Sequence, residues 1–328
     1  MASSQISPTG ICGGAALSAC KRGGPWHHML GLLQSFLNIK AEVDAVSYCS
    51  TIVACGKVSW QSALRVFQRM VHDEGILPDV ITYTAAAHAC GIHGQWQHSL
   101  SLFDSLCSAN LQPNTVMYSS MISACDVGGV WEISFGFLDL LLQDGLELDA
   151  VVFGATITAY ESQGMWKEAL QLLDGMSAAL VPPNRVCCNA AISACDKGGQ
   201  WQLGLHLLFS LPLRRLRADA VSYGAAINAC RQSRQWQISL ALLQEMPVNG
   251  IERTAIAYTS VVSAFDKAGE WAMALAMLSR MAVECVQPTL ASYGAAMSAC
   301  DSASAWASAL NLLDKMELQN LVPTGLIA

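Results

Sequence analysis

The chain has 328 residues, of which 53% are hydrophobic and 13% charged, and its formal net charge is −7. An average soluble domain has about 25% charged residues, so this chain has ample apolar surface to bury, and intrinsic disorder is excluded. A membrane-spanning helix needs roughly 18 to 20 apolar residues, and the nearest stretch, 135–142, is interrupted by Asp139, so no membrane span is predicted.

The sequence divides into a leader (1–9), blocks of 35 residues, and a tail (325–328). A fixed period over nearly the whole chain predicts a linear array of nine repeats. The blocks are 10–44, 45–79, 80–114, 115–149, 150–184, 185–219, 220–254, 255–289 and 290–324. The leader lacks the features of a signal or transit peptide. Either no targeting segment exists or the chain is a fragment of a longer protein.

Three residue types recur in phase with this period. The tryptophans are 35 residues apart except around Trp60: Trp26, Trp60, Trp96, Trp131, Trp166, Trp201, Trp236, Trp271 and Trp306. The cysteine column is Cys20, Cys55, Cys90, Cys125, Cys195, Cys230 and Cys300. The aromatic column is Tyr48, Tyr83, Tyr118, Phe153, Tyr223, Tyr258 and Tyr293. Three columns in phase make coincidence an inadequate explanation.

Each block is predicted to hold two helices. Tyr223, Ile227 and Cys230 have the spacing of one helix face, which places the first helix around 221–230. Small residues such as the Gly pair at 198–199 then turn the chain, and each Trp opens a second apolar pattern that ends before a short loop, often with a proline. A single helix pair cannot bury its apolar faces, so the pairs are expected to stack into an all-α solenoid.

The Trp, Cys, Tyr and Leu columns are predicted to form the shared core of this solenoid. Base stacking by Trp and metal binding by Cys are the functional alternatives. They fit less well, because the Trp lies among apolar positions and there is no Cys/His cluster with metal-ligand spacing. The cysteines are expected to be reduced, and the pairs at 27–28 (His-His) and 187–188 (Cys-Cys) to be ordinary surface or packing residues. No metal and no cofactor are predicted.

This pattern resembles the pentatricopeptide repeat (PPR) family, whose motif is a 35-residue helical hairpin. The resemblance covers 10–324, and its strongest copies read VSYGAAINAC (221–230), VCCNAAISACDKGGQW (186–201) and AYTSVVSAFDKAGEW (257–271). The related tetratricopeptide repeat has a different period and arrangement of Trp, Gly and Pro. The resemblance implies a P-type-like array in a right-handed α-solenoid superhelix of helix-turn-helix repeats. It also implies single-stranded RNA recognition, one repeat per base, in a plastid or mitochondrion.

The resemblance assigns base choice to two residues per repeat. The first follows the aromatic column: Gly14, Cys49, Thr84, Ser119, Gly154, Asn189, Gly224, Thr259 and Gly294. The second closes the repeat: Asp44, Asp79, Asn114, Asp149, Asn184, Asp219, Thr254, Thr289 and Thr324. A residue one step beyond the buried aromatic is turned about 100° from the core stripe, and a short polar side chain there can meet a base edge. The alternative is that the closing residues are only helix N-caps.

The pairing rules of the family imply an A-G-A-U preference for repeats three to six. The pairs that imply adenosine, guanosine, adenosine and uridine in turn are Thr84 with Asn114, Ser119 with Asp149, Gly154 with Asn184, and Asn189 with Asp219. The other repeats depart from the family pattern, since they carry Cys or Gly as the first residue or close with Thr. They are expected to contribute little specificity.

Charge argues for weak RNA binding. Affinity for nucleic acids normally depends on Lys and Arg, yet the net charge is −7. In the column where the family commonly carries a phosphate-contacting lysine, four repeats have a basic residue: Arg22, Lys57, Lys197 and Lys267. Binding is therefore expected to be modest and sensitive to salt.

The sequence contains no phosphate-binding Gly loop, no nucleophile elbow and no distinct pair of carboxylates, so catalysis by this chain is not expected. The leading hypothesis is an RNA-binding adaptor in organellar RNA processing, stability or translation, with protein partners supplying any catalysis. The rival hypothesis is a protein-binding scaffold. A third is a fragment whose function lies elsewhere. Self-association is also possible, because an uncapped solenoid end exposes apolar surface.

Overall fold

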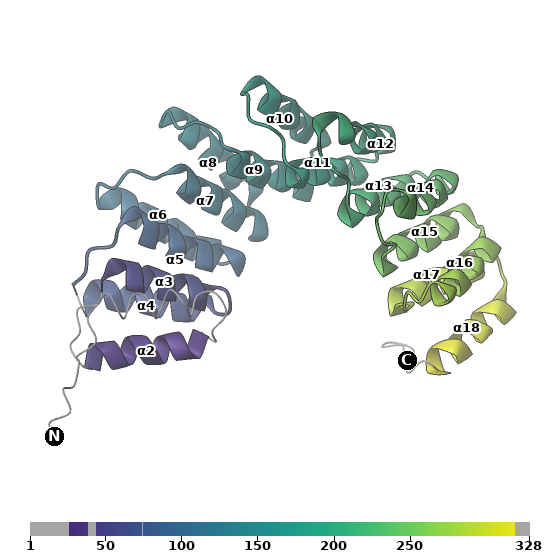
Figure 1. The fold of residues 1–328 in the computed structure, drawn as a ribbon, viewed down its shortest axis with the longest axis horizontal. Coiled ribbons are helices and arrows are strands. Elements are labelled where there is room, and N and C mark those ends of the chain that lie inside the picture. Colours follow the sequence, from purple (N-terminus) through teal and green to yellow (C-terminus); the bar gives the residue numbers. More distant parts are fainter. Residues whose placement is uncertain (1–25, 39–43, 74, 319–328) are drawn as a thin grey trace. The chain divides into compact units, whose positions relative to one another are not determined.

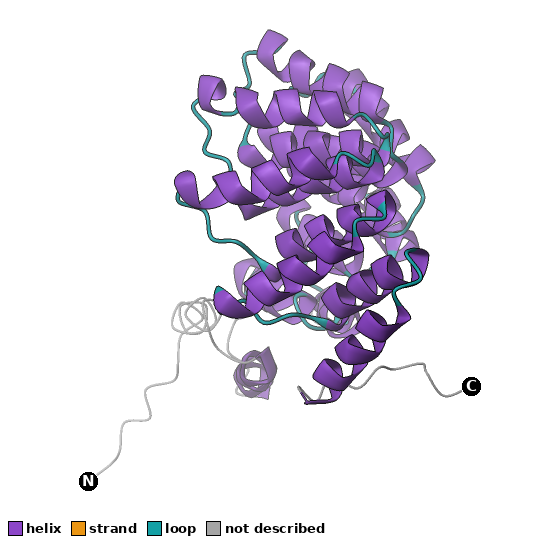
Figure 2. Cartoon of the chain, turned by 90° about the vertical axis from the view of Figure 1, so that its right-hand side faces the viewer, coloured by secondary structure: helices purple, strands orange, loops and turns teal. Residues whose placement is uncertain are grey.

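The computed structural model of the chain describes residues 26–38, 44–73 and 75–318. Within these ranges every regular element is helical and none is a strand (Figure 2). None of the helices in these ranges is long and apolar enough to cross a membrane. The chain divides into two compact units, Met1–Ala159 and Tyr160–Ala328. The prediction of an all-α fold is confirmed.

The first helix of each block from residue 45 onward, called the A helix, begins directly after an Asp, Asn or Thr. The side chain of that residue accepts a hydrogen bond from the backbone N–H three positions on, as when Asn184 Oδ1 accepts from Cys187 N at 2.9 Å. The bond satisfies a donor that has no partner inside the helix. The A helices are α3 (Ala45–Gly56), α5 (Val80–Ile92), α7 (Thr115–Val127), α9 (Ala150–Gln163), α11 (Arg185–Lys197), α13 (Ala220–Gln232), α15 (Ala255–Ala268) and α17 (Leu290–Ser302).

The second helix of each block, called the B helix, begins at the periodic Trp. The B helices are α2 (Trp26–Asn38), α4 (Trp60–His72), α6 (Trp96–Ser108), α8 (Trp131–Gln143), α10 (Trp166–Ala178), α12 (Trp201–Ser210), α14 (Trp236–Val248), α16 (Trp271–Val283) and α18 (Trp306–Leu318). Helix α12 is the shortest, and a 3₁₀ turn at Pro212–Arg214 follows it. Proline lacks the N–H that would continue the α-helical hydrogen bonds.

Each unit is built of two layers of helices. A helices pack on the A helices of neighbouring repeats, as α3, α5 and α7 do in the first unit and α11, α13, α15 and α17 in the second. A B helix packs between its own A helix and the next one, as α14 does between α13 and α15. Figure 1 shows the hairpins of each unit following one another in chain order. This is the stacking predicted for an α-solenoid.

The cysteine and aromatic columns form the core, as predicted. The described column cysteines are all 0% exposed, and the column aromatics are at most 8% exposed. The described cysteines are free thiols, and burial raises the pKa of Cys55, Cys125 and Cys195 to about 11. In the described ranges no cluster of three or more His, Cys, Asp or Glu is placed to hold a metal ion. Cys20 lies outside these ranges.

The tryptophans differ from the prediction of a buried core column. The Trp rings between 60 and 271 are only half-buried, and Trp306 is 72% exposed. Each Trp is the first residue of a B helix, and Trp96 and Trp166 pack on the turn of the following repeat. A Cβ added to Gly128 would lie 2.3 Å from Cδ1 of Trp96, and one on Gly198 would lie 2.2 Å from Cδ1 of Trp166. Trp96 and Trp166 therefore join successive repeats at the edge of the core.

The two dipeptides singled out in the sequence take ordinary positions. His27 and His28 are exposed on α2, and Cys187 and Cys188 are buried in the first turn of α11. The prediction that they are surface and packing residues is confirmed.

Candidate nucleic-acid interface

The two predicted base-reading columns meet at the N-terminal ends of the A helices. Because A helices pack side by side, the fifth residue of one A helix lies near the N-cap of the next. Asn189 lies on α11, and Asp219 is the N-cap of α13. The amide Nδ2 of Asn189 donates to Oδ1 of Asp219 at 3.2 Å. The structure thus brings together the pair of residues that the sequence assigned to uridine.

Two further side chains complete this cluster. The hydroxyl of Ser222 lies 2.7 Å from Asn189 Oδ1 and 2.9 Å from Asp219 Oδ1. Arg185 Nε lies 3.0 Å from the other carboxylate oxygen, Asp219 Oδ2. Burial alone would raise the pKa of Asp219, but hydrogen bonds from Ser222 and Asn189 and the charge of Arg185 outweigh burial and lower it. Asp219 is therefore ionised at neutral pH and acts only as an acceptor.

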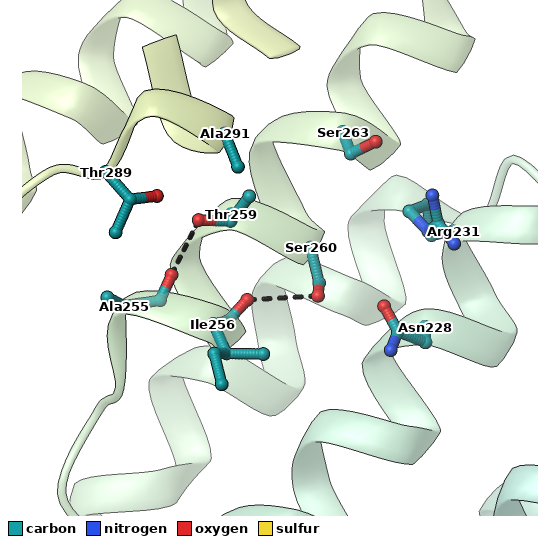
Figure 3. A pocket seen from close by; sticks show the side chains of 9 residues that line it. All are labelled: Asn228, Arg231, Ala255, Ile256, Thr259, Ser260, Ser263, Thr289 and Ala291. Carbon is teal, nitrogen blue, oxygen red and sulfur yellow. Dashed lines mark hydrogen bonds between the residues drawn. The ribbon is translucent and has the colours of Figure 1, made fainter. Parts of the chain in front are cut away.

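A similar arrangement occurs in the repeat at 255–289. The hydroxyl of Ser292 lies 2.7 Å from Thr259 Oγ1 and 3.0 Å from Thr289 Oγ1. Thr259 and Thr289 line a pocket of about 340 Å³ over α13, α15 and the start of α17, and Figure 3 shows their hydroxyl groups facing each other. The sequence predicted little specificity from this repeat, yet its two assigned residues share a pocket.

The pairs assigned to repeats three and four are more enclosed. Thr84 is 8% exposed and Ser119 is 5% exposed. Each hydroxyl donates to its own helix, Thr84 Oγ1 to Val80 O at 2.6 Å and Ser119 Oγ to Val116 O at 3.0 Å. A hydroxyl that donates in this way keeps a lone pair, so these two side chains can offer an acceptor to a ligand.

The described closing residues are helix N-caps, and the alternative interpretation was that capping is their only role. Every described member accepts a hydrogen bond from the first turn of the following A helix: Asp44, Asp79, Asn114, Asp149, Asn184, Asp219, Thr254 and Thr289. Capping uses one lone pair and leaves other polar capacity free. Gly154 is buried in α9 of the first unit, whereas Asn184 is exposed in the second. Gly14 and Thr324 lie outside the described residues.

The sequence reasoning missed a column of exposed apolar side chains. In seven of the eight described A helices the second residue is β-branched and between 56% and 71% exposed: Val46, Ile81, Val116, Val151, Val186, Val221 and Ile256. Helix α17 has Ala291 there. Exposed apolar side chains rimmed by polar groups mark interaction surfaces. The 35-residue recurrence was present in the sequence, but it resembles that of the core columns, and only the structure shows that this column faces outward.

The predicted phosphate-contacting residues lie at the opposite ends of the A helices, about 12 Å along the axis from the base-reading column. Lys57, Lys197 and Lys267 are exposed there. Lys197 Nζ lies 3.7 Å from Glu161 Oε1, so its charge is partly neutralised. Such cations also stabilise the C-terminal ends of helices. Arg22 lies outside the described residues.

A further cation was missed because it stands one position earlier than this column. Arg231 lines the pocket at Thr259, as Figure 3 shows. Its Nε is buried and has no hydrogen-bond partner within the part of the chain that is described. An unsatisfied buried donor is costly, so an anionic or acceptor group of a ligand would be favoured here.

The pentatricopeptide repeat domain matches residues 65–127, 138–197 and 241–302, more than half of the chain, and the PPR repeat matches 221–251. The chain belongs to the pentatricopeptide repeat family. A comparison of this PPR chain with curated protein sequences finds no match.

Solved PPR structures share the fold. Maize PPR10 is 18% identical, with a TM-score of 0.56, and the match covers 95% of this chain and 49% of PPR10. PPR10 in complex with an 18-nt psaJ RNA element is 17% identical, with a TM-score of 0.59, and the match covers 96% of this chain and 56% of PPR10. This PPR chain thus spans about half the length of these structures.

Proposed function

We propose that this chain is a sequence-selective, single-stranded RNA-binding adaptor that reads one base per repeat. The observation that carries the proposal is the 3.2 Å contact between Asn189 and Asp219. It joins the two assigned columns at one point, next to an exposed apolar side chain, Val186. The 18-nt RNA in the PPR10 complex supports RNA as the ligand class.

In this proposal repeats three to six prefer A-G-A-U. The amide of Asn189 keeps one N–H and one lone pair free, which suits a base edge with both an acceptor and a donor. The exposed β-branched side chains at the second residue of the A helices, such as Val186, contact the faces of the bases. Lys57, Lys197 and Lys267 contact phosphates.

The cellular role follows from family membership. By covering or presenting a short RNA segment in a plastid or mitochondrion, the chain changes RNA processing, stability or translation, and a protein partner supplies any catalysis. Fluorescence of a tagged full-length protein should coincide with one of these organelles. A purely nuclear or cytosolic signal contradicts the organellar part of the proposal and leaves RNA binding untouched.

RNA binding is tested by titration of purified protein with a short RNA containing A-G-A-U, a scrambled RNA and the matching DNA, at low and moderate salt. Changing Asn189→Ala and Asp219→Ala together should remove the preference for uridine, by about tenfold, since each lost hydrogen bond contributes about 1 kcal/mol. Asp79→Ala is the matched control. It removes the same kind of N-cap, but its column partner is Cys49, so the uridine preference should persist.

A protein-binding scaffold is the second candidate. The exposed apolar column together with a net charge of −7 favours a peptide over a polyanion. Equal or absent binding to all three nucleic acids would contradict RNA recognition and favour this candidate.

A further inference from the structure

Arg231 reverses the charge of its position in the repeat. The residue directly after the cysteine column is acidic in blocks four, five, six, eight and nine: Asp126, Glu161, Asp196, Asp266 and Asp301. In block seven this residue is Arg231, in the last turn of α13, and Gln232 follows it in the lysine column. Block seven therefore lacks a lysine in that column but carries a cation one residue earlier.

No neighbouring side chain neutralises the charge of Arg231. Its Nε is buried without a hydrogen-bond partner, and its guanidinium forms no ion pair with any described residue. Asp196 stands at the same position of α11. Burial raises the pKa of its carboxyl group, and the charge of Arg231 is the largest influence that opposes this rise. Asp196 is thus close enough to be affected by Arg231 without pairing with it.

The pocket of about 340 Å³ beside Arg231 has further donors and open space. The half-buried side chains of Asn228 and Ser263 also line it, and neither forms a hydrogen bond within the described ranges. On the α17 side the pocket is bordered by Ala291, where the other described A helices carry a larger β-branched residue. Arg231, Asn228 and Ser263 can therefore all donate to one ligand group.

The position along the helix favours a phosphate over a base edge as that group. Arg231 lies seven residues after Gly224, the assigned base-reading residue of its repeat, or about 10 Å along the axis. Figure 3 shows Thr259 and Thr289 at the opposite end of the pocket. An arginine has only donors, and its charge-assisted bonds to phosphate oxygens are stronger than neutral hydrogen bonds. Ser and Asn side chains are also common phosphate ligands.

We propose that Arg231 binds a backbone phosphate of the RNA, with Asn228 and Ser263 as further donors, and so replaces the missing lysine of its repeat. The inference rests on the proposed function and adds a phosphate contact outside the assigned lysine column. A strand that presents a base edge to Thr259 and Thr289 has its backbone near Arg231. The contact is independent of base identity, because all four nucleotides carry the same phosphate.

The test compares the affinity and the salt dependence of RNA binding. The RNAs contain A-G-A-U flanked on both sides by several nucleotides, in four versions that differ in the flanking base. Arg231→Gln should weaken the binding of all four about tenfold at low salt. It should also make the slope of log affinity against log salt shallower by about 0.7, the value for one phosphate of a single strand. Arg231→Lys should keep most of the slope, since lysine binds phosphate as a point charge.

The matched control is Arg65→Gln, which removes one charge from an exposed arginine on the B helix α4, outside the pocket. Its slope should equal that of the parent chain. Blocks two and three carry Gly56 and Gly91 at the position of Arg231, so the fold accepts an uncharged residue there. Thermal unfolding checks that each variant remains folded, and Arg231→Ala is used if Arg231→Gln does not fold.

The outcomes separate the inference from the function on which it rests. If the parent chain binds no RNA, the proposed function fails and this inference fails with it. If the parent chain binds and Arg231→Gln leaves the slope unchanged, or Arg65→Gln changes it equally, Arg231 is not a phosphate contact and RNA binding stands. If the loss is confined to one flanking base, or Arg231→Lys loses as much as Arg231→Gln, Arg231 reads a base edge and the inference is wrong.

Discussion

At the scale of single residues, capping a helix and forming a ligand site are compatible roles. Asp219 caps α13 through Oδ1, and the same oxygen holds Asn189, while Oδ2 faces Arg185. A carboxylate has about four lone-pair sites, so one cap does not exhaust it. The closing residues therefore do cap the A helices, and this role leaves base recognition open to them.

A second residue-scale feature predicts how stability depends on pH. Burial alone would raise the pKa of Glu284, but hydrogen bonds from Tyr258, Arg253 and Arg280 lower it to about 2. The distances to Glu284 are 2.5 Å from Tyr258 Oη, 2.6 Å from Arg253 Nη1 and 2.9 Å from Arg280 Nε. Because the pKa of Glu284 is lower in the folded chain than in the unfolded chain, where it is about 4.5, the ionised carboxylate stabilises the fold at pH values above 4.5. This stabilisation is lost as the pH falls towards 2.

We therefore expect Glu284→Gln to lower the free energy of unfolding at pH 7 by roughly 1 to 2 kcal/mol, because charge-assisted bonds are strong but this site is partly exposed. The difference between variant and parent should shrink below pH 4.5. Urea unfolding at several pH values measures both. Glu270→Gln, at an N-cap without a side-chain capping bond, is the control, and an equal effect there would contradict this account.

At the scale of elements, the turn between the A and B helices sets how repeats join. Gly129 and Gly199 have φ values of 74° and 68° there, which L side chains rarely adopt. The residue before each, Gly128 or Gly198, is helical in backbone conformation and lies under a Trp ring of the preceding repeat. In each pair, the second glycine therefore allows the turn, and the first glycine leaves room for the Trp ring of the preceding repeat.

Because Gly198 lies against a Trp ring and Gly175 does not, we expect their Gly→Ala changes to have opposite effects on stability. Gly198→Ala should lower the free energy of unfolding by about 1 to 3 kcal/mol, since its Cβ would lie 2.2 Å from Cδ1 of Trp166. Gly175→Ala, in α10 with no atom within 4 Å of its Cβ, should raise it by about 0.5 to 1 kcal/mol through helix propensity. Thermal and urea unfolding of both variants measure the difference. Equal stabilisation by both would show that the Trp contact is unimportant.

At the scale of the whole molecule, the charge balance limits how the chain can hold a polyanion. The net charge is −7, and one of the exposed column lysines, Lys197, is paired with Glu161. A single-stranded nucleic acid releases about 0.7 counterion per phosphate neutralised. Under the proposed function, affinity for RNA therefore comes largely from base contacts and only in small part from phosphates.

The salt dependence of RNA binding tests this balance. The plot of log affinity against log salt should have a slope of about −2, as expected for two or three neutralised phosphates. Changing Lys57→Gln and Lys267→Gln together should make the slope shallower by about 1.4 without altering base preference. Lys197→Gln should change it less, because Glu161 lies 3.7 Å from this lysine. A slope that the double variant leaves unchanged would show that these lysines do not contact phosphate.

The sequence by itself determined the helical hairpins, the cysteine and aromatic core columns, and the two columns of assigned residues. Period and side-chain character are local properties that repeat in every block, so nine copies reinforce one pattern. Tertiary structure decided the rest, because contacts between repeats join residues about 30 positions apart. Only packing shows that two of the Trp rings rest on the next turn, that Val186 and its column face outward, and that Ser222 joins Asn189 to Asp219. Periodicity alone cannot distinguish a buried column from an exposed one, since both recur at the same interval.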